Sequence, residues 1–432
     1  MRRLHAVLVE RATPRLIELL AAALDGTGPA ILPLDAGLPA GRIAKLIDAL
    51  NPGSIEDAEG VTTVRSAREE RVAEGTAVIV GTSGSTGSPK GVELSAAALR
   101  HSARASLDRL GARPGERWLC CLPATHVAGL QVLVRSLVSG TEPALAERAD
   151  AETLAAGSAS GCAHVSLVPT QLERLLAHAG PATPLAGFSS VLLGGAAAPT
   201  GLLAAARAAG VPVVTTYGMT ETCGGCVYDG LPLDGVRVEV REDDRIWIGG
   251  PVLFSGYRGG PGGYGGAGSP PQEGSGGMDP PGENSAGATP PGESTSWFRT
   301  GDLGRLDASG RLTVRGRADD VINTGGHKVV PGEVAAALQT CPGVRDVAVL
   351  GQPDPEWGER VIAVVVPTDP AHPPSLELLR LHVRERLPRY AAPSEVVMVD
   401  AVPALPSGKH DIARLRRELL RREQTGAESV TN

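Results

Sequence analysis

The stretch Ala77-Val78-Ile79-Val80-Gly81-Thr82-Ser83-Gly84-Ser85-Thr86-Gly87-Ser88-Pro89-Lys90-Gly91 carries the first signal for the fold. Its first four residues are apolar and mostly β-branched, which predicts a buried strand. The strand runs into a loop of glycines and hydroxyl side chains. Glycines let backbone N–H groups form a nest for an anion, hydroxyls can donate to phosphate oxygens, and Lys90 adds a positive charge. We therefore predict a phosphate-binding loop rather than a plain Gly/Ser surface loop. It is not a Walker A loop, because Lys90 precedes glycine instead of serine or threonine.

Strands and helices alternate on both sides of this loop. A helix is predicted over 95–110, with Ser95 as its N-cap. The other elements predicted here are strands at 30–34, 118–122, 164–167, 190–193 and 211–215 and helices at 14–24, 39–50, 130–137, 170–177 and 199–209. This alternation predicts an α/β fold in which helices cover both faces of a parallel sheet. The period-two pattern at 236–248 predicts a small antiparallel β subdomain.

The length of 432 residues calls for two or more domains. We assign 1–318 to a large N-terminal domain and 319–432 to a small α+β C-terminal domain. The second domain is predicted to hold strands at 346–350, 361–366 and 396–399, helices starting at Pro331 and over 375–387, and a frayed tail from Glu423. The stretch 259–296 has 13 Gly and 7 Pro in 38 residues, which predicts a disordered insertion in a surface loop.

Composition excludes several classes of function. The net charge is −7 and there is no basic run, which argues against a nucleic-acid surface. No apolar run reaches membrane-spanning length, and the N-terminus lacks the pattern of a signal peptide, so a cytoplasmic location is expected. Cys223 and Cys226 have the spacing of a metal knuckle. No second Cys/His pair lies at a suitable distance, so no zinc site is expected.

Four later motifs hold side chains that could do chemistry: YGMTE at 217–221, FRTGD at 298–302, GRADDVINTGGHK at 316–328 and PSGK at 406–409. Ligands of open α/β sheets bind at the carboxyl ends of strands, so Glu221 could hold Mg²⁺ beside a phosphate loop. Asp302 is expected in a tight turn, where a carboxylate can accept both hydroxyls of a ribose. Taken singly, each motif also fits a solvated or capping role.

Together, in this order and spacing, the five motifs resemble the adenylate-forming superfamily of acyl-CoA synthetases, carrier-loading adenylation domains and luciferases. The resemblance covers roughly residues 75–415, apart from the Gly/Pro insertion. It implies an enzyme that uses ATP and Mg²⁺ to convert a carboxylate into an acyl-adenylate, and then passes the acyl group to a thiol such as that of coenzyme A.

The resemblance also implies roles for individual residues. The β- and γ-phosphates of ATP are assigned to Thr82, Ser83, Gly84, Ser85, Thr86, Gly87 and Lys90. The adenosine is assigned to Gly195, Ala196, Tyr217, Asp302 and Arg317, where Asp302 accepts the ribose hydroxyls. Mg²⁺ is assigned to Glu221 and Thr86. The catalytic set is His126, Thr220, Glu221 and Lys409, of which Thr220 contacts the α-phosphate and Lys409 bridges that phosphate and the acyl carboxylate. Asp319 matches the hinge of the C-terminal domain, and Gly326 lines the path of the pantetheine arm of coenzyme A.

The segments 126–137 and 217–230 are similar to those of o-succinylbenzoate–CoA ligases, which serve menaquinone biosynthesis. His126 resembles the gating residue of the acyl pocket, and the substrate site is expected to hold His126, Gln131, Arg135 and Gly218. A polar pocket with Gln131 and Arg135 suits a dianionic acid better than a fatty acid.

Three other hypotheses stay open: a ligase for another aryl or short-chain acid, an adenylation enzyme that loads a carrier protein, and a non-catalytic homologue. Retention of Lys409, Glu221 and Asp302 argues against the last. The expected partners are the acid, ATP and CoA, and the sequence leaves a homo-oligomer open.

Overall fold

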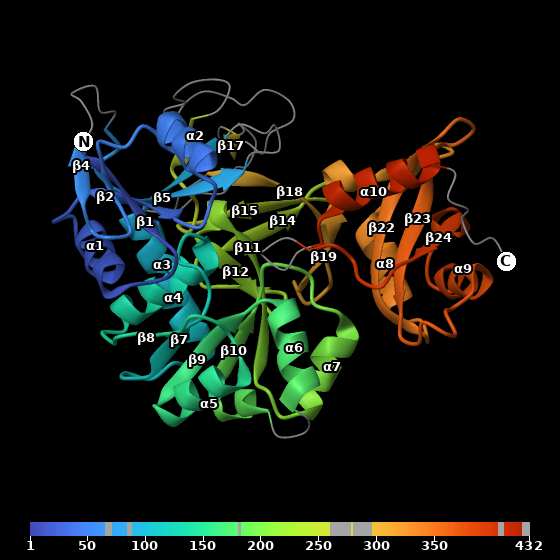
Figure 1. The fold of residues 1–432 in the computed structure, drawn as a ribbon, viewed down its shortest axis with the longest axis horizontal. Coiled ribbons are helices and arrows are strands. Elements are labelled where there is room, and N and C mark those ends of the chain that lie inside the picture. The colour runs from blue at the N-terminus through green and yellow to red at the C-terminus, as the bar shows by residue number, and fades with distance from the viewer. Residues whose placement is uncertain are drawn as a thin grey trace.

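The computed structural model describes residues 1–64, 71–83, 89–179, 183–259, 278–279, 296–404 and 410–425. Within these residues the strands form four sheets. Figure 1 shows three of them in a large body that begins at the N-terminus, and the fourth in a smaller body at the right, coloured orange to red. The predicted fold class, a large α/β domain with a small antiparallel part and a small α+β C-terminal domain, is confirmed. The boundary at 318/319 stays a prediction.

The first sheet is mixed. In the order of the sheet its strands are β16 (Gly256–Arg258), β6 (Pro89–Ser95), β5 (Thr76–Ser83), β2 (Ala30–Asp35), β1 (Leu4–Val9), β3 (Ser54–Glu56) and β4 (Thr62–Val64). Strands β5, β2, β1 and β3 are parallel, whereas β16, β6 and β4 join in antiparallel fashion. The sequence predicted the parallel strands β2 and β5, but neither β1 and β3 nor the antiparallel strands at the two edges.

The second sheet is parallel over most of its width. Its strands, in order, are β13 (Leu231–Pro232), β12 (Gly224–Tyr228), β11 (Val213–Met219), β10 (Ser190–Leu193), β9 (Cys162–Leu167), β7 (Arg117–Cys120) and β8 (Ala144–Leu145). Only β12 and β13 at one edge are antiparallel to their neighbours. Strand β11 is longer than predicted, so Tyr217 and Gly218 lie within the strand.

Helices fill three layers around these two sheets (Figure 1). In chain order the helices of the large body are α1 (Pro14–Asp25), α2 (Ala40–Leu50), α3 (Ala96–Leu110), α4 (Val127–Val138), α5 (Ala151–Ala159), α6 (Pro169–Ala179) and α7 (Thr200–Ala208), with short 3₁₀ turns at Pro184–Gly187 and Thr220–Thr222. Helices α1, α3 and α4 share one core with both sheets, α2 covers the outer face of the first sheet, and α5, α6 and α7 cover the outer face of the second. Ser95 caps α3 as predicted, and α5 was not predicted.

The run 77–80 shows how the sequence builds these layers. Val78 and Val80 belong to the core that contains α1, α3 and α4. Ile79 points the other way and packs with Leu46 and Leu50 of α2. Because successive side chains of a strand face opposite sides, an unbroken apolar run is what a strand between two helix layers requires.

The third sheet is antiparallel. It contains β14 (Arg237–Val240), β15 (Arg245–Gly249), β18 (Trp297–Leu306) and β17 (Met278–Asp279) in that order, and β19 (Leu312–Arg317) pairs with β18. The pairing of β14 with β15 confirms the predicted subdomain, and Asp244 has a positive φ of 58° in the turn between them. Ile246, Ile248 and Phe298 extend the main core into this sheet.

The fourth sheet forms the C-terminal part. Its strands are β21 (His327–Val329), β20 (Ile322–Thr324), β23 (Gly358–Pro367) and β22 (Val344–Asp354), with β24 (Glu395–Met398) beside β23. Its helices are α8 (Pro331–Gln339), α9 (Leu376–Arg384) and α10 (Ile412–Thr425), with 3₁₀ turns at Ala318–Asp320 and Arg389–Ala391. Alternate residues of β23 face α8 and α9 on one side and α10 on the other. The frayed tail predicted from Glu423 is wrong up to Thr425, because α10 continues to that residue.

Two site residues lie in a different local structure from the one predicted. Asp302 is inside β18, opposite Arg317 of β19, and not in a tight turn. The strand continues because both of its edges find partners, β15 and β19. Lys90 lies on β6, which pairs antiparallel with β5, so both ends of the phosphate-loop motif lie on paired strands. The residues 260–277 and 280–295, which hold most of the predicted disordered insertion, lie outside the described part of the chain.

Arg315 of β19 holds the C-terminal part against the third sheet. Its Nε and Nη2 donate to the two carboxylate oxygens of Glu333 on α8, at 2.6 and 3.1 Å, and its Nη1 donates to Asp244 at 2.7 Å. Gly332 of α8 lies against β19 so closely that a Cβ there would be 2.4 Å from the carbonyl oxygen of Arg315.

None of the helices in the described part of the chain combines the length and apolar surface that a bilayer crossing requires.

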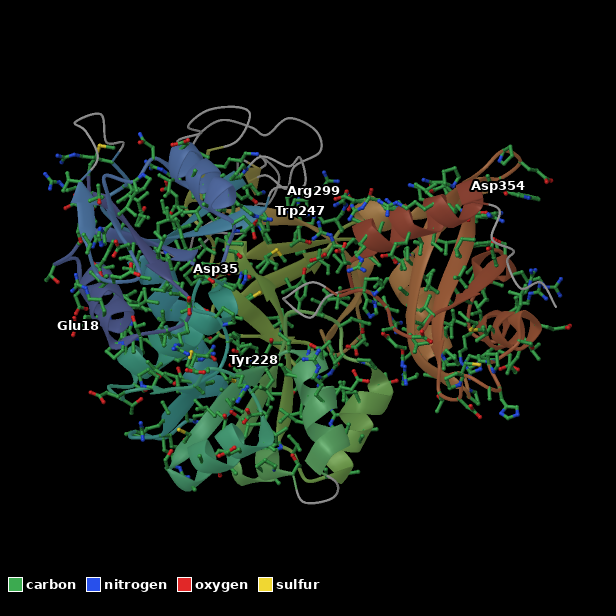
Figure 2. The ribbon with its side chains drawn as sticks, in the orientation of Figure 1. Glu18, Asp35, Tyr228, Trp247, Arg299 and Asp354 are labelled. Carbon is green, nitrogen blue, oxygen red and sulfur yellow. The ribbon has the colours of Figure 1, made fainter. Side chains whose placement is uncertain are left out.

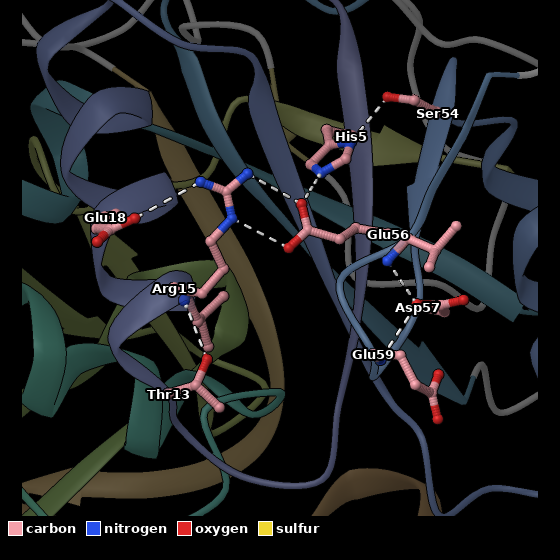
Figure 3. Close-up of polar contacts among 10 residues, drawn as sticks. His5, Thr13, Arg15, Glu18, Ser54, Glu56, Asp57 and Glu59 are labelled. Atoms are coloured by element: carbon pink, nitrogen blue, oxygen red, sulfur yellow. Dashed lines mark hydrogen bonds and ion pairs between the residues drawn. The ribbon is translucent and has the colours of Figure 1, made fainter.

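A buried carboxylate joins three elements at the far edge of the first sheet. Glu56 on β3 is 3% exposed. Arg15 of α1 donates Nε and Nη2 to its two oxygens at 3.1 and 3.0 Å, and His5 Nε2 of β1 lies 3.3 Å from Oε2 (Figure 3). His5 Nδ1 is 2.7 Å from Ser54 Oγ. The hydrogen bonds from Arg15, and then that from His5, hold the pKa of Glu56 below its ordinary value of 4.5 despite burial.

We expect Glu56→Gln to destabilise the protein by about 1–3 kcal/mol at pH 7, because a charged acceptor of several hydrogen bonds is lost. A lowered carboxyl pKa contributes stability above the unfolded pKa and loses it as pH falls through the folded pKa. The gap between variant and wild type should therefore close as pH falls below about 4.5. Urea-unfolding midpoints over a series of pH values measure this difference in stability between variant and wild type. Glu59→Gln, an exposed change in the turn that follows β3 (Figure 3), is the control. A gap that is constant with pH would contradict the linkage.

Candidate nucleotide and acyl site

Asp302 is the centre of a polar cluster between the second and third sheets. The hydroxyl of Tyr217 on β11 donates to Asp302 Oδ2 at 2.8 Å, and Arg317 Nη1 lies 3.4 Å from Oδ1. Asp302 is 8% exposed, and its backbone N–H donates to Thr300 Oγ1 at 3.0 Å. Glycine at 301 makes room for the arginine, because a Cβ there would be 2.7 Å from Arg317 Nη2. The structure thus brings together three predicted site residues, Tyr217, Asp302 and Arg317.

Burial, reinforced by the Asp302 carboxylate, raises the pKa of Tyr217 well above its ordinary value. The phenol therefore keeps its proton and donates to the carboxylate. A carboxylate that is held by Tyr217 and Arg317 still has lone pairs to accept from further donors, as a ribose offers.

Glu221 lies in the 3₁₀ turn that follows β11 directly, next to Thr220. Its backbone oxygen accepts from the N–H of Phe254 at 2.9 Å. Its side chain accepts from the hydroxyl of Tyr257 at 2.8 Å. Glu221 is thus at the carboxyl end of a central strand, the edge where open α/β sheets bind ligands.

The positions of Asp302 and Glu221 allow a test of the predicted Mg²⁺ site. Among the described residues no three His, Cys, Asp or Glu side chains gather as a metal site. A cage built only of protein side chains is therefore not found there. One carboxylate that shares the ion with nucleotide phosphates is a common way to bind Mg²⁺, and Glu221 fits it. Cys223 and Cys226 are buried thiols, and burial raises the pKa of Cys226 to about 12.

Lys90 reaches the same place from the first sheet. Its Nζ lies 4.0 Å from the ring centroid of Tyr257. Thr82 pairs with Lys90 across the hairpin, and Thr82 Oγ1 lies 3.3 Å from the carbonyl oxygen of Lys90. The predicted phosphate ligands Gly84, Ser85, Thr86 and Gly87, and the side chain of Ser83, lie outside the described part of the chain. The sequence reasoning missed Tyr257, because its two contacts come from positions far apart in the chain.

The predicted acyl side of the site lies at helix α4. His126 is the residue before its first turn, and burial lowers the pKa of His126 although Asp35 (Figure 2) opposes the effect. Gln131 is 2% exposed and donates Nε2 to the carbonyl oxygen of Cys223 at 2.7 Å. Its Oε1 has no hydrogen-bond partner among the described residues.

Arg135, one helical turn beyond Gln131, is a buried cation. It is 5% exposed, donates Nη2 to Ser166 Oγ at 3.2 Å and lies 4.2 Å above the ring of Trp118. Among the described residues its Nε has no hydrogen-bond partner, and its hydrogen bond to Ser166 is not to a carboxylate. Burial lowers the pKa of Arg135. An unpaired buried charge is costly, so this guanidinium is suited to an anionic ligand.

Three small residues shape the space between β10 and β12. Gly195 follows β10 with a φ of 83°, and the half-buried Ala196 comes next. At Gly218 a Cβ would lie 2.0 Å from the carbonyl oxygen of Gly224, so only glycine fits the irregular pairing of β11 with β12.

The predicted residues of the C-terminal part are placed differently. Asp319 lies in the 3₁₀ turn after β19, 3.8 Å from Arg317. Gly326, with a φ of 79°, is in the turn between β20 and β21, and within the described residues no hydrogen bond or ion pair joins that turn to Asp302 or Glu221. Lys409 lies outside the described part of the chain. The ends of its loop are held together by a β-bridge between Ala404 and His410.

A hollow of about 500 Å³ lies elsewhere, at the amino ends of β10 and β11. Ser190, Val213 and Tyr228 (Figure 2) are among the residues that line it. None of the predicted site residues lines this hollow. Ligands of open α/β sheets bind at the opposite, carboxyl ends of the strands, where Glu221 follows β11.

Two protein families match this chain. Residues 30–258 match the family described as AMP-binding enzyme, and residues 333–409 match its C-terminal domain. A probable 2-succinylbenzoate–CoA ligase of Mycobacterium tuberculosis is 43% identical over 425 residues, which are 96% of this chain and 98% of that protein.

Solved structures agree with these matches. The o-succinylbenzoate CoA synthetase of Bacillus subtilis in complex with its acyl-adenylate intermediate superposes with a TM-score of 0.74 at 26% identity, covering 97% of this chain and 88% of the other. The same enzyme has been solved with ATP and magnesium ion. An amide bond synthetase from Marinactinospora thermotolerans gives a TM-score of 0.77 at 26% identity, covering 96% and 90%. The resemblance found in the sequence is confirmed, and this chain belongs to the AMP-binding enzyme family of adenylate-forming ligases.

Proposed function

We propose that the protein is an ATP-dependent o-succinylbenzoate–CoA ligase of menaquinone biosynthesis. It activates the acid as an acyl-adenylate with release of pyrophosphate, and then transfers the acyl group to coenzyme A. The observation that carries the choice of acid is Arg135, a buried guanidinium that no carboxylate pairs with among the described residues. The cytoplasmic location and the homo-oligomer remain predictions.

In this proposal ATP lies across the cluster around Asp302. The carboxylate accepts the ribose hydroxyls, Arg317 lies beside the same sugar, and adenine packs between Tyr217 and the backbone at Gly195 and Ala196. Support comes from the 2.8 Å hydrogen bond between Tyr217 and Asp302, which fixes the acceptor before the nucleotide arrives. A preorganised acceptor avoids the cost of ordering a side chain upon binding.

The triphosphate extends from there toward Thr220, Glu221 and Lys90. Glu221, with Thr86, would hold Mg²⁺, which when bound supplies positive charge to the phosphates. Thr220 contacts the α-phosphate. Lys90 and the hairpin loop hold the β- and γ-phosphates, which leave as pyrophosphate.

The chemistry needs charge compensation more than bond-making groups. An oxygen of the acid attacks the α-phosphorus, a P–O bond forms, and the bond to pyrophosphate breaks with its electron pair. Lys409 and Lys90 reduce the repulsion between the two anions and stabilise the in-line transition state. The thiolate of coenzyme A then attacks the acyl carbon, AMP leaves with the electron pair of the C–O bond, and a thioester results.

In the second step the thiol must reach the acyl carbon, whose oxygen Lys409 contacts during the first step. Lys409 must therefore move away before the thiol can enter. A turn of residues 319–432 about Asp319 would withdraw Lys409 and bring Gly326 toward the thiol's path. Two orientations of one small domain are a common solution when one site performs two reactions.

The aromatic carboxylate of the acid pairs with Arg135 in this proposal, with Gln131 Oε1 or Nε2 beside it, while the succinyl carboxylate reaches the α-phosphate past His126 and Gly218. An anion would satisfy the Nε of Arg135, which has no partner within the described residues. A fatty acid would leave this charge buried and uncompensated.

The second candidate is a ligase for another aryl or short-chain acid, or an enzyme that loads a carrier protein. The superposition on an amide bond synthetase supports this second candidate, because enzymes with this fold pass the acyl group to more than one kind of acceptor.

The proposal is tested by pyrophosphate release and thioester formation with o-succinylbenzoate, 3-benzoylpropionate, benzoate and a medium-chain fatty acid, each with and without free CoA. 3-Benzoylpropionate is the proposed substrate without its aromatic carboxylate. We expect a CoA thioester from o-succinylbenzoate with kcat/KM at least about 100-fold higher than for 3-benzoylpropionate, because the latter leaves Arg135 unpaired. Thioester from another acid only, or acyl transfer to a carrier only, would overturn it.

Arg135→Met should raise the KM for o-succinylbenzoate at least about 30-fold and leave the KM for ATP within about twofold, because only the acid loses a charged partner. The melting temperature should not fall, since the variant removes a buried charge that lacks a carboxylate. Arg104→Met, an exposed change on α3, is the control. An unchanged KM for the acid would show that Arg135 is only part of the core.

Asp302→Asn should raise the KM for ATP about 10- to 100-fold, because an amide accepts ribose hydroxyls less strongly than a carboxylate does. The KM for the acid should change little. ATP–pyrophosphate exchange measures both constants, and Asp243→Asn, which removes an exposed partner of Arg299 in the same sheet (Figure 2), is the control. Equal ATP constants for Asp302→Asn and wild type would place the ribose elsewhere.

A further inference from the structure

Tyr257 stands between two groups of the proposed site that come from different sheets. Its hydroxyl donates to Glu221 Oε1 at 2.8 Å. The opposite side of the same residue, its ring face, carries Lys90 Nζ at 4.0 Å from the centroid. One side chain therefore contacts both the carboxylate assigned to Mg²⁺ and the lysine assigned to the leaving phosphates.

The strand pairing explains this geometry. Tyr257 on β16 is directly opposite Val92 on β6. Lys90 is two positions from Val92 along β6, so its side chain is on the same face and diagonal to Tyr257. The contact between the ring and the ammonium group is thus set by backbone register.

Residues on either side of Tyr257 restrict its movement. Arg258 is 1% exposed and donates Nε to the carbonyl oxygen of Leu50 at 2.8 Å. The ring of Phe254 lies 4.8 Å from that of Tyr257, and the N–H of Phe254 donates to the backbone of Glu221. The tyrosine and the glutamate are therefore held to each other through main chain as well as side chain.

The hydrogen bond leaves one oxygen of Glu221 available. Tyr257 uses Oε1, and Oε2 accepts no hydrogen bond from any described residue.

We propose that Tyr257 is a positioning residue that fixes Glu221 with Oε2 free for Mg²⁺ and holds Lys90 toward the leaving phosphates. The inference rests on the proposed function, in which Glu221 binds the metal. Without the hydroxyl the carboxylate would rotate freely, and Mg²⁺ binding would have to order it. Without the ring Lys90 would lose its only aromatic contact in the described residues.

The test is a Mg²⁺ titration of the full chain, followed by the rate of pyrophosphate release and, separately, by calorimetric binding of α,β-methylene-ATP. Tyr257→Phe should need about two- to tenfold more Mg²⁺ for half-saturation in both measurements, the equivalent of one hydrogen bond to a charged group. Its kcat at saturating Mg²⁺ should stay within about twofold. Tyr257→Leu should in addition raise the KM for ATP about two- to fivefold, because the ring contact with Lys90 is lost.

Tyr228→Phe is the matched control, because it removes a buried tyrosine hydrogen bond of similar length, 2.7 Å to Ser106 Oγ, away from Glu221. An unchanged or lower Mg²⁺ requirement in Tyr257→Phe, or an equal rise in Tyr228→Phe, would overturn the inference. Glu221→Gln distinguishes a failure of this inference from a failure of the proposed function. If it raises the Mg²⁺ requirement and Tyr257→Phe does not, the proposed function stands and the inference falls. If the wild type forms no thioester, the proposed function falls.

Discussion

The hydrogen bond between Tyr217 and Asp302 joins two sheets that the chain builds 85 positions apart. Tyr217 belongs to β11 in the second sheet, and Asp302 belongs to β18 in the third. A carboxylate that is 8% exposed is tolerated only if donors meet it, so the third sheet must lie where Tyr217 of the second sheet can reach Asp302. The same placement brings Phe254 onto the turn that carries Glu221. The arrangement of the proposed nucleotide site thus depends on satisfying one buried charge.

Local patterns were enough to predict the layers of the fold. The apolar runs at 77–80 and 361–366 both become strands with helices on each face, since an unbroken run has no side that water could cover. Ser95 and Pro331 begin α3 and α8 through capping and a preset φ, which are properties of the residues themselves. The edges of the sheets were harder to predict from the sequence. Strand β1 was missed, and the antiparallel strands at the edges of the two large sheets were not predicted, because the direction of an edge strand depends on where its connection leads.

The site was predictable where the motif resemblance reached, and not beyond it. Asp302 was expected in a turn because FRTGD contains glycine and a carboxylate, yet pairing on both edges of β18 extends the strand through it. Tyr257 carries no local signal, since it acts through Glu221, 36 positions earlier, and through Lys90 on another strand. Arg135 was predicted as a substrate ligand. Only the structure shows that it lies 4.2 Å above the ring of Trp118 and has no carboxylate partner among the described residues.

Arg315 lies just before Asp319 in the chain, and Glu333 lies after it. The bidentate pair between them therefore bridges the position proposed as a hinge, while Asp244 holds the same guanidinium to the third sheet. Any turn of the C-terminal part about Asp319 would have to separate a fork of two parallel hydrogen bonds on a partly exposed surface. Ions in solution weaken such contacts. If the C-terminal part turns as proposed, the balance between its two orientations would therefore depend on ionic strength through Arg315.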